Sequence, residues 1–254
     1  MSLVHAEYLK ISRRKLYPVM VLILGFLVGL LAFILLIFRK VAPDLAQDIP
    51  VLAKPEAFLV GAQQVVGQTW FPMILAVVLI GADLASTVWA TSLTRNPSKP
   101  GHIAARLTVI TAASWLAMLL GIAGWAVLTA LVADGEGGPS AVDWLDIVWK
   151  VGVIQIAWVA LAMGAIAMLR SVGPAIGAVI AFSFAESILA IWAPYQNVSL
   201  SAATNGLFDV DIGGSFGAFT PGGDLSQPHA LAIIAGWTIL GLALTWWGLQ
   251  RRDA

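Results

Sequence analysis

The sequence contains no cysteine and unusually little charge. The absence of cysteine excludes disulfides and cysteine-based metal or thiol chemistry in this chain, although it does not identify a compartment. Charged residues make up 11% of the sequence, against roughly 25% in ordinary soluble domains. The formal net charge is zero, so the basic footprint of a nucleic-acid-binding protein is missing and we expect no nucleic-acid partner.

Recognisable catalytic motifs are also absent. No Gly-Lys-Ser or Gly-Lys-Thr occurs, so the chain has no phosphate-binding loop for ATP. The three histidines, His5, His102 and His229, are far apart, and none has a partner at metal-ligand spacing. We therefore predict that the chain is not an enzyme and that it binds no metal or cofactor directly.

Apolar residues, in contrast, make up 59% of the chain. Several apolar runs exceed the roughly 18 residues that indicate a membrane-spanning helix. The first run, Leu16–Phe38, is longer than the apolar core of a signal peptide and lacks a small-residue cleavage site, so it is expected to be a retained span. The pattern predicts an all-α integral membrane protein with one domain over residues 1–254. The expected spans are about 16–38, 65–82, 107–133, 147–169, 174–193 and 230–249.

The segments between the spans have distinct characters. Residues 3–15 predict an interfacial elbow helix with Glu7, Lys10 and Arg14 on one stripe, and Glu7–Lys10 is an i,i+3 ion pair. Residues 55–66 could form a short surface helix, and Lys150 is expected to snorkel to the membrane interface. The outer loop 194–229, rich in Gly, Asn, Asp and Ser, suggests a functional or partly re-entrant loop.

The stretch Ile80–Arg106 links two spans and is amphipathic. If it is helical over 83–95, one arc carries polar residues and the opposite arc carries Ala85, Trp89 and Leu93. The polar arc consists of Asp83, Thr87, Thr91, Thr94 and Arg95. A basic run with Pro97, Lys99 and Pro100-Gly101 then breaks the segment. Such a segment can lie on the membrane surface and offer its polar face to another protein.

The distribution of charge predicts the orientation. If the N-terminus is cytosolic, that face holds 10 of the 14 lysines and arginines. These are Lys10, Arg13, Arg14, Lys15, Arg95, Lys99, Arg106, Arg170, Arg251 and Arg252. The positive-inside rule therefore favours an even number of spans, with both termini and the 80–106 segment in the cytosol.

One ionisable residue, Glu186, is predicted to lie deep in a span. It follows Pro174 by 12 residues, roughly 18 Å along a helix, in a hydrocarbon layer about 30 Å thick. A carboxylate at that depth should face the bundle interior, a water-filled cavity or a partner subunit. Two readings remain open: an interface residue hydrogen-bonded to Ser183 or Ser187, and a residue of the translocation path.

Three stretches carry a resemblance to a known family. They are the N-terminal helix with Glu7-Tyr8-Leu9-Lys10, the segment GADLASTVWATSLTRNPSK at 81–99, and the ending WGLQRRD at 247–253. Together with the six-span layout, they resemble the permease subunit of an ABC-2 type ABC transporter over nearly the whole chain. The middle stretch is similar to the family's G-x-E-x-x-x-G-T…L-x-x-P-x-S-R segment. It departs from that segment at Asp83, where Glu is usual, and at Ser86, where Gly is common.

The resemblance implies a six-span exporter subunit in a bacterial plasma membrane. It would pair with a second permease, identical or homologous, amid membrane lipid, and dock on a separate ATPase that holds ATP and Mg. The elbow helix, the coupling segment 83–100 and the turn 170–173 would contact the ATPase, and loop 194–229 would form the outer gate. The implied contact residues are Glu7, Lys10, Arg14, Asp83, Thr87, Thr91, Arg95, Pro97, Lys99 and Arg170.

The sequence leaves two questions open. Lipids, peptides, antibiotics and ions all remain as cargo, because one bundle can host many substrates. The alternative function is a non-transporting membrane partner of an ABC system, such as an immunity or sensor subunit.

Overall fold

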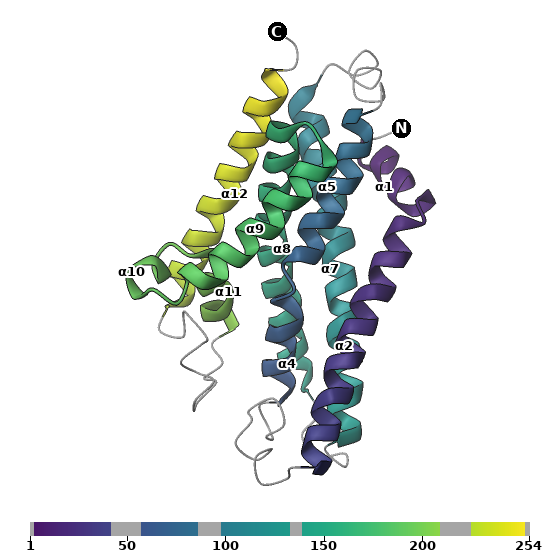
Figure 1. Ribbon diagram of the computed structural model, residues 1–254, viewed down its shortest axis with the longest axis vertical. Helices are drawn as coiled ribbons and strands as arrows, with labels where there is room; N and C mark the ends of the chain where they lie inside the picture. The colour runs from purple at the N-terminus through teal and green to yellow at the C-terminus, as the bar shows by residue number, and fades with distance from the viewer. Residues whose placement is uncertain (1–2, 42–56, 86–97, 133–138, 209–224, 252–254) are drawn as a thin grey trace.

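The computed structural model describes residues 3–41, 57–85, 98–132, 139–208 and 225–251 (Figure 1). Within these ranges the chain is helical and contains no strand, which confirms the all-α prediction. The helices are α1 (Leu3–Arg13), α2 (Leu16–Val41), α4 (Ala57–Val66), α5 (Trp70–Ala85), α7 (Lys99–Val132), α8 (Ala141–Leu169), α9 (Val172–Leu189), α10 (Ala193–Gln196), α11 (Leu200–Phe208) and α12 (Gln227–Gln250).

Five helical segments among these residues are long and apolar enough to cross a membrane. A sixth is obtained if α1 and α2, which meet at a bend of 64°, are taken as one broken span. The five are Gly61–Leu84, Lys99–Leu128, Ala141–Leu169, Val172–Leu189 and Gln227–Gln250. The chain is thus built as a multi-pass membrane protein. Helix α1 and the C-terminal end of α12 lie at the same end of the bundle (Figure 1).

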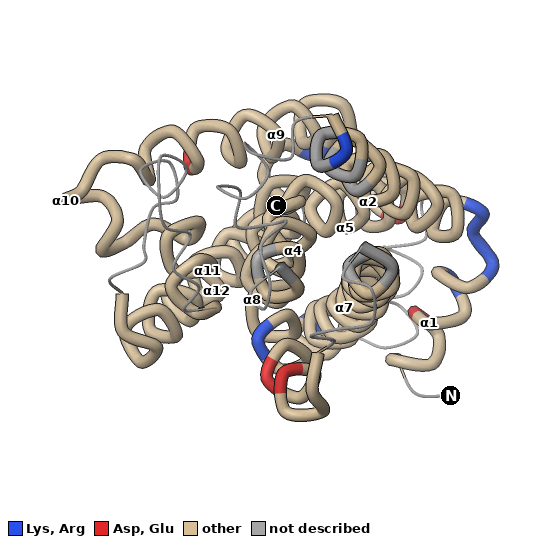
Figure 2. Tube along the Cα trace, turned by 90° about the horizontal axis from the view of Figure 1, so that it is seen from below, with Lys and Arg blue, Asp and Glu red and all other residues tan. Residues whose placement is uncertain are grey.

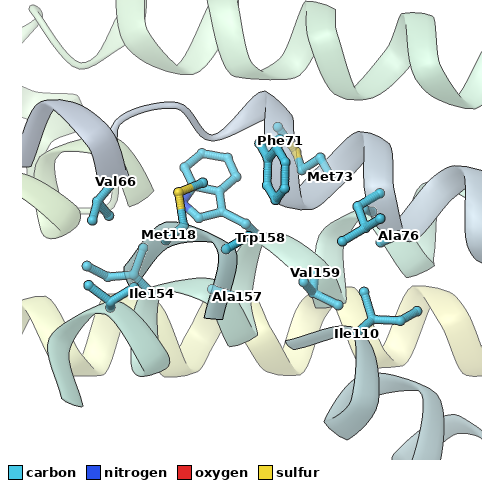
Figure 3. Close-up of a cluster of buried hydrophobic side chains, with 14 of the residues drawn as sticks. Val66, Phe71, Met73, Ala76, Ile110, Met118, Ile154, Ala157, Trp158 and Val159 are labelled. Carbon is cyan, nitrogen blue, oxygen red and sulfur yellow. The ribbon is translucent and has the colours of Figure 1, made fainter. Parts of the chain in front are cut away.

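Helix α8 forms the centre of the bundle and contacts α5, α7, α9 and α12. Trp158, on α8, is fully buried, and its ring lies 6.1 Å from that of Phe182 on α9. Figure 3 shows the side chains of Trp158, Phe71 and Met118 pointing into the same core. Because lipid tails are as apolar as these side chains, close packing, rather than removal from water, holds the helices together.

Small residues join α8 to α12 in a close contact. A Cβ atom added to Gly241 would lie 2.5 Å from the backbone carbon of Ala160, and one added to Gly248 would lie 2.7 Å from that of Ala167. Glycine therefore allows the two backbones to approach one another along this face, as small residues do in other membrane helix pairs.

Gly241→Ala is expected to destabilise the protein by about 1–3 kcal/mol, because the new methyl group would press against the α8 backbone. Thermal unfolding in detergent measures the change. The matched control is Gly236→Ala on the same helix, where an added Cβ meets nothing within 4 Å. Equal melting temperatures for the two variants would contradict this packing.

The second span differs from the predicted one. Helix α4 is not a surface helix: Ala62, Val65 and Val66 are buried in the core. It continues into α5 after a short break, so that Gly61–Leu84 forms one span. A ten-residue apolar helix has too little periodicity to distinguish a surface position from a buried one.

Pro100 lies in the first turn of α7, where a missing N–H is tolerated, and the predicted amphipathic segment before it lies mostly outside the described residues. One further prediction at a helix end was wrong. Lys150 does not snorkel to the interface. It is 4% exposed and pairs with Asp146 at 2.5 Å, and its ammonium lies 5.9 Å from the ring centroid of Phe208 on α11.

Candidate functional site

Five charged side chains meet where α1, α5 and α7 come together. We call them the elbow cluster: Glu7, Lys10, Arg14, Asp83 and Arg106. The first three lie on one stripe at the N-terminal end, because their i, i+3 and i+7 spacing repeats the helical period. Asp83 is in the last turn of α5, and Arg106 is about two turns into α7.

Asp83 is the centre of the cluster. Its carboxylate accepts hydrogen bonds from Arg106 at 2.8 Å, from Arg14 at 2.9 Å and from Lys10 at 3.1 Å. The Asp83 and Arg106 side chains are only 5% and 3% exposed. Taking such charges out of water is costly, and several charge-assisted hydrogen bonds are needed to offset that cost.

Glu7 adds a second acid beside the first. Its Oε1 atom accepts from Lys10 at 2.9 Å, which confirms the predicted pair, and lies 3.5 Å from Nε of Arg106. Arg14 also donates to the carbonyl oxygen of Leu79 at 3.2 Å. Three cations therefore surround two carboxylates, and the cluster has a formal charge of plus one.

The elbow cluster joins three helices to one another and does not form an open pocket. The space enclosed by its side chains is about 10 Å³, room for about one water molecule. Its hydrogen bonds join α1 to the end of α5 and to the start of α7. These last two ends flank residues 86–98, so both sides of that segment are attached to α1.

The predicted contact residues differ in where they lie. Glu7, Lys10 and Arg14 contribute to the elbow cluster. Asp83 was expected on an exposed arc, but its side chain is buried beneath α1 because α5 continues to Ala85 and turns Asp83 inward. Lys99 is half-buried at the start of α7. The remaining members, Thr87, Thr91, Arg95 and Pro97, lie outside the described residues.

Arg170 forms the predicted short turn between α8 and α9. It adopts a left-handed conformation with φ of 59°, and its N–H caps α8 by donating to the carbonyl oxygen of Ile166 at 3.0 Å. Its exposed guanidinium donates to the carbonyl oxygen of Arg251 at 3.1 Å. The turn is thus fixed to the C-terminal end of α12 and remains at the surface.

Arg106 was not among the predicted site residues. In the sequence it counted only towards orientation, as the last cation before an apolar run. Arg106 could have been found from the sequence, because a charge at the start of a membrane span needs a partner of opposite charge. Asp83, at the end of the preceding span, is the acid best placed to be that partner.

Glu186 forms a second polar centre, in the interior of the bundle. It is 1% exposed. Its Oε1 atom accepts from the hydroxyl of Ser199 at 2.9 Å and from the backbone N–H groups of Leu200 and Ser201. Its Oε2 atom accepts from Tyr195 at 2.5 Å. A carboxylate from α9 therefore caps the positive N-terminal end of α11.

These contacts correct the predicted partners of Glu186. Ser183 shares a hydrogen bond with Thr69 at 2.6 Å, and Ser187 donates to the carbonyl oxygen of Ser183 at 2.9 Å. Neither serine bonds to Glu186 in these contacts. All nine α11 residues are at least half-buried.

Burial, together with the hydrogen bond to Glu186 and its negative charge, raises the pKa of Tyr195 above its ordinary value. The phenol therefore remains protonated at physiological pH and can donate to the carboxylate. Among the described residues, no group of three His, Cys, Asp or Glu side chains is placed to hold a metal ion.

No family model matches the chain, and no curated protein matches it.

Proposed function

We propose that the chain is the membrane-spanning permease subunit of an ATP-driven ABC-2 type exporter, working with a separate ATPase. The observation that carries this proposal is the elbow cluster. It attaches the two helix ends that flank residues 86–98 of the coupling segment 83–100 to a helix bent by 64° from α2. This arrangement suits a part of the membrane domain that receives force from outside the bilayer.

In the proposed mechanism, contacts between the ATPase and the coupling segment change the packing of the membrane spans. An ATPase that pushes on the coupling segment would displace the end of α5 and the start of α7. Because Asp83 bonds to Arg106 and to Lys10, a displacement of either end would be transmitted to α1. ATP can drive this change only if the contacts made by the ATP-bound ATPase differ between two packings of the spans. The spans would then move as rigid bodies from one packing to the other.

The remaining parts of the proposal concern the partners. A second permease, identical or homologous, would complete the pathway, and ATP with Mg would bind the ATPase. The exposed turn at Arg170 would supply a second contact for the ATPase. Helix α11, held by Glu186, would contribute to the outer gate, and export would be the direction of transport.

Affinity purification of the tagged chain from its native membranes tests the proposal. We expect an ATPase with a phosphate-binding loop to copurify and to hydrolyse ATP in lipid vesicles, while the isolated chain hydrolyses none. Cargo that stimulates this hydrolysis and accumulates across the vesicle membrane supports a permease. Stimulated hydrolysis without accumulation would indicate a sensor or immunity subunit, and no copurifying ATPase would contradict the proposal.

Arg95→Glu is expected to reduce transport about tenfold while ATP hydrolysis and expression are retained, a loss within the usual range of coupling between sites. The reason is that the basic end of the coupling segment would lose its attraction for the ATPase surface. Parallel assays of hydrolysis and transport in vesicles measure the ratio of the two rates. The matched control is Lys40→Glu, the same charge reversal near the far end of α2. Unchanged transport by Arg95→Glu would count against the coupling role.

A further inference from the structure

A groove runs between α2 and α7, below the elbow cluster. It has a volume of about 140 Å³, and the residues that line it are all apolar. The lining residues are Val21, Leu24, Gly25, Val28, Gly29, Ala117, Leu120, Gly121, Gly124 and Leu128. The residues from each helix recur every three or four positions, so each set forms one continuous stripe.

The groove opens towards the outside of the bundle. Gly25, Leu120 and Gly124, which lie along it, are exposed. A Cβ atom added to Gly25, Gly29 or Gly124 would meet nothing within 4 Å. The described part of the chain therefore leaves this space unfilled, although α2 and α7 pack against each other on either side of it.

A polar contact closes the groove at the end nearest α1. The Tyr17 hydroxyl donates to the carbonyl oxygen of Ala113 at 3.0 Å, bridging α2 and α7. On the other side of this hydrogen bond lie Arg14 and Val109, which line the small cavity of the elbow cluster. The groove and the cluster are therefore neighbouring but separate features.

Two cations without an acidic partner among the described residues precede the groove along the chain, near the junction of α1 and α2. Arg13 and Lys15 are exposed, and no ion pair joins them to a described carboxylate. The carbonyl oxygen of Lys15 accepts from the N–H of Val19 at 3.2 Å, so Lys15 continues the helical course of α2. It precedes the exposed Leu22 by seven residues and lies on the same side of α2 as that residue, which is the neighbour of the lining residue Val21. Figure 2 shows this basic corner where α1 meets α2.

The spacing between the cations and the groove fits one phospholipid. Lys15 precedes Val21 by six residues, about 9 Å along a helix. That separation suits a phosphate at the membrane interface and an acyl chain that starts in the hydrocarbon layer. Helix α1 also exposes Val4 and Tyr8, an i,i+4 pair, as a helix lying at that interface would.

We propose that the groove holds part of one acyl chain of an anionic phospholipid, with the lipid phosphate near Arg13 and Lys15. The charge of the elbow cluster, plus one, adds to the attraction. A helix of a second copy is 10–12 Å across and could place only side chains in this space. A flexible acyl chain can follow the groove along its length.

Native mass spectrometry of the full chain, released from micelles with equimolar dioleoyl phosphatidylglycerol and dioleoyl phosphatidylcholine, tests the proposal. We expect one phosphatidylglycerol to be retained in preference to phosphatidylcholine. Arg13→Ala with Lys15→Ala should reduce this preference about 30-fold, because each cation near an anionic headgroup strengthens binding about fivefold.

A second pair of substitutions tests the groove. Gly25→Leu with Gly124→Leu should abolish retention of both lipids, and the alanine pair at the same positions should weaken it if the leucine pair does not fold. Gly177→Leu on α9 is the matched control, since an added Cβ there also meets nothing within 4 Å. The proposal would be overturned if the Gly25→Leu, Gly124→Leu variant retained lipid as the unsubstituted chain does. It would also be overturned if the preference for phosphatidylglycerol were unchanged without Arg13 and Lys15, or if the chain formed a dimer that only the filled groove disrupts.

Discussion

Asp83→Ala is expected to lower the free energy of unfolding by about 3–5 kcal/mol, the usual cost of removing one partner of a buried ion pair. The physical reason is that Arg106, whose side chain is 3% exposed, would lose its 2.8 Å hydrogen bond to Asp83 and remain buried. Lys10 and Arg14 would lose a partner as well, but they are about one third exposed and can turn towards water. Thermal unfolding of the purified variant in detergent measures the effect.

A double variant distinguishes a lost partner from a lost side chain. Asp83→Leu with Arg106→Met removes both buried charges, and replacing a buried pair by apolar side chains is often neutral or stabilising. We expect this variant to recover most of the stability lost by Asp83→Ala. If the single and double variants melt at the same temperature, Asp83 and Arg106 do not depend on each other.

Glu186→Ala is expected to cost about 3–5 kcal/mol, because it leaves the buried N-terminal N–H groups of α11 and the Ser199 hydroxyl without their acceptor, at about 1–3 kcal/mol each. Glu186→Gln should cost about 1 kcal/mol, since an amide oxygen can replace Oε1. Thermal unfolding ranks the three proteins. Transport assays on Glu186→Gln then test the other reading, in which Glu186 contacts cargo.

Ser187→Ala is the matched control on the same helix. Its hydroxyl is exposed and donates only to the carbonyl oxygen of Ser183 in this structure, so a change within about 0.5 kcal/mol is expected. A Glu186→Ala protein as stable as this control would show that the carboxylate does not hold α11. Normal stability of Glu186→Gln together with lost transport would favour the translocation path.

The long apolar helices could be predicted from the sequence because a span needs about 20 apolar residues and few other structures do. The bend before Leu16 followed from the change to a charged stripe containing Glu7. Helix α11 could not be predicted with its polar and glycine-containing sequence, since its stability comes from burial and from the Glu186 cap. Helix α4 was wrongly predicted to lie at the surface, because its burial depends on contacts with other helices that the local sequence does not show.

The candidate site was only partly predictable, for a related reason. The pairing of Glu7 with Lys10 is local and follows from helical spacing. The inward direction of Asp83 depends on where α5 ends and on a cation 23 residues later in the chain. The partners of Glu186 follow it by nine to fifteen residues, across a turn that periodicity does not reveal.

The most direct test of the account is a distance measurement in the ATPase complex. The chain has no cysteine, so spin labels can be placed at Ser12→Cys on α1 and Thr108→Cys on α7, both exposed. A reference pair joins Ser12→Cys to Gln250→Cys on α12. We predict that nucleotide trapping shifts the reference distance and leaves the α1–α7 distance unchanged, because the elbow cluster moves as one body. A shifted α1–α7 distance, or two unchanged distances during ATP turnover, would contradict the account.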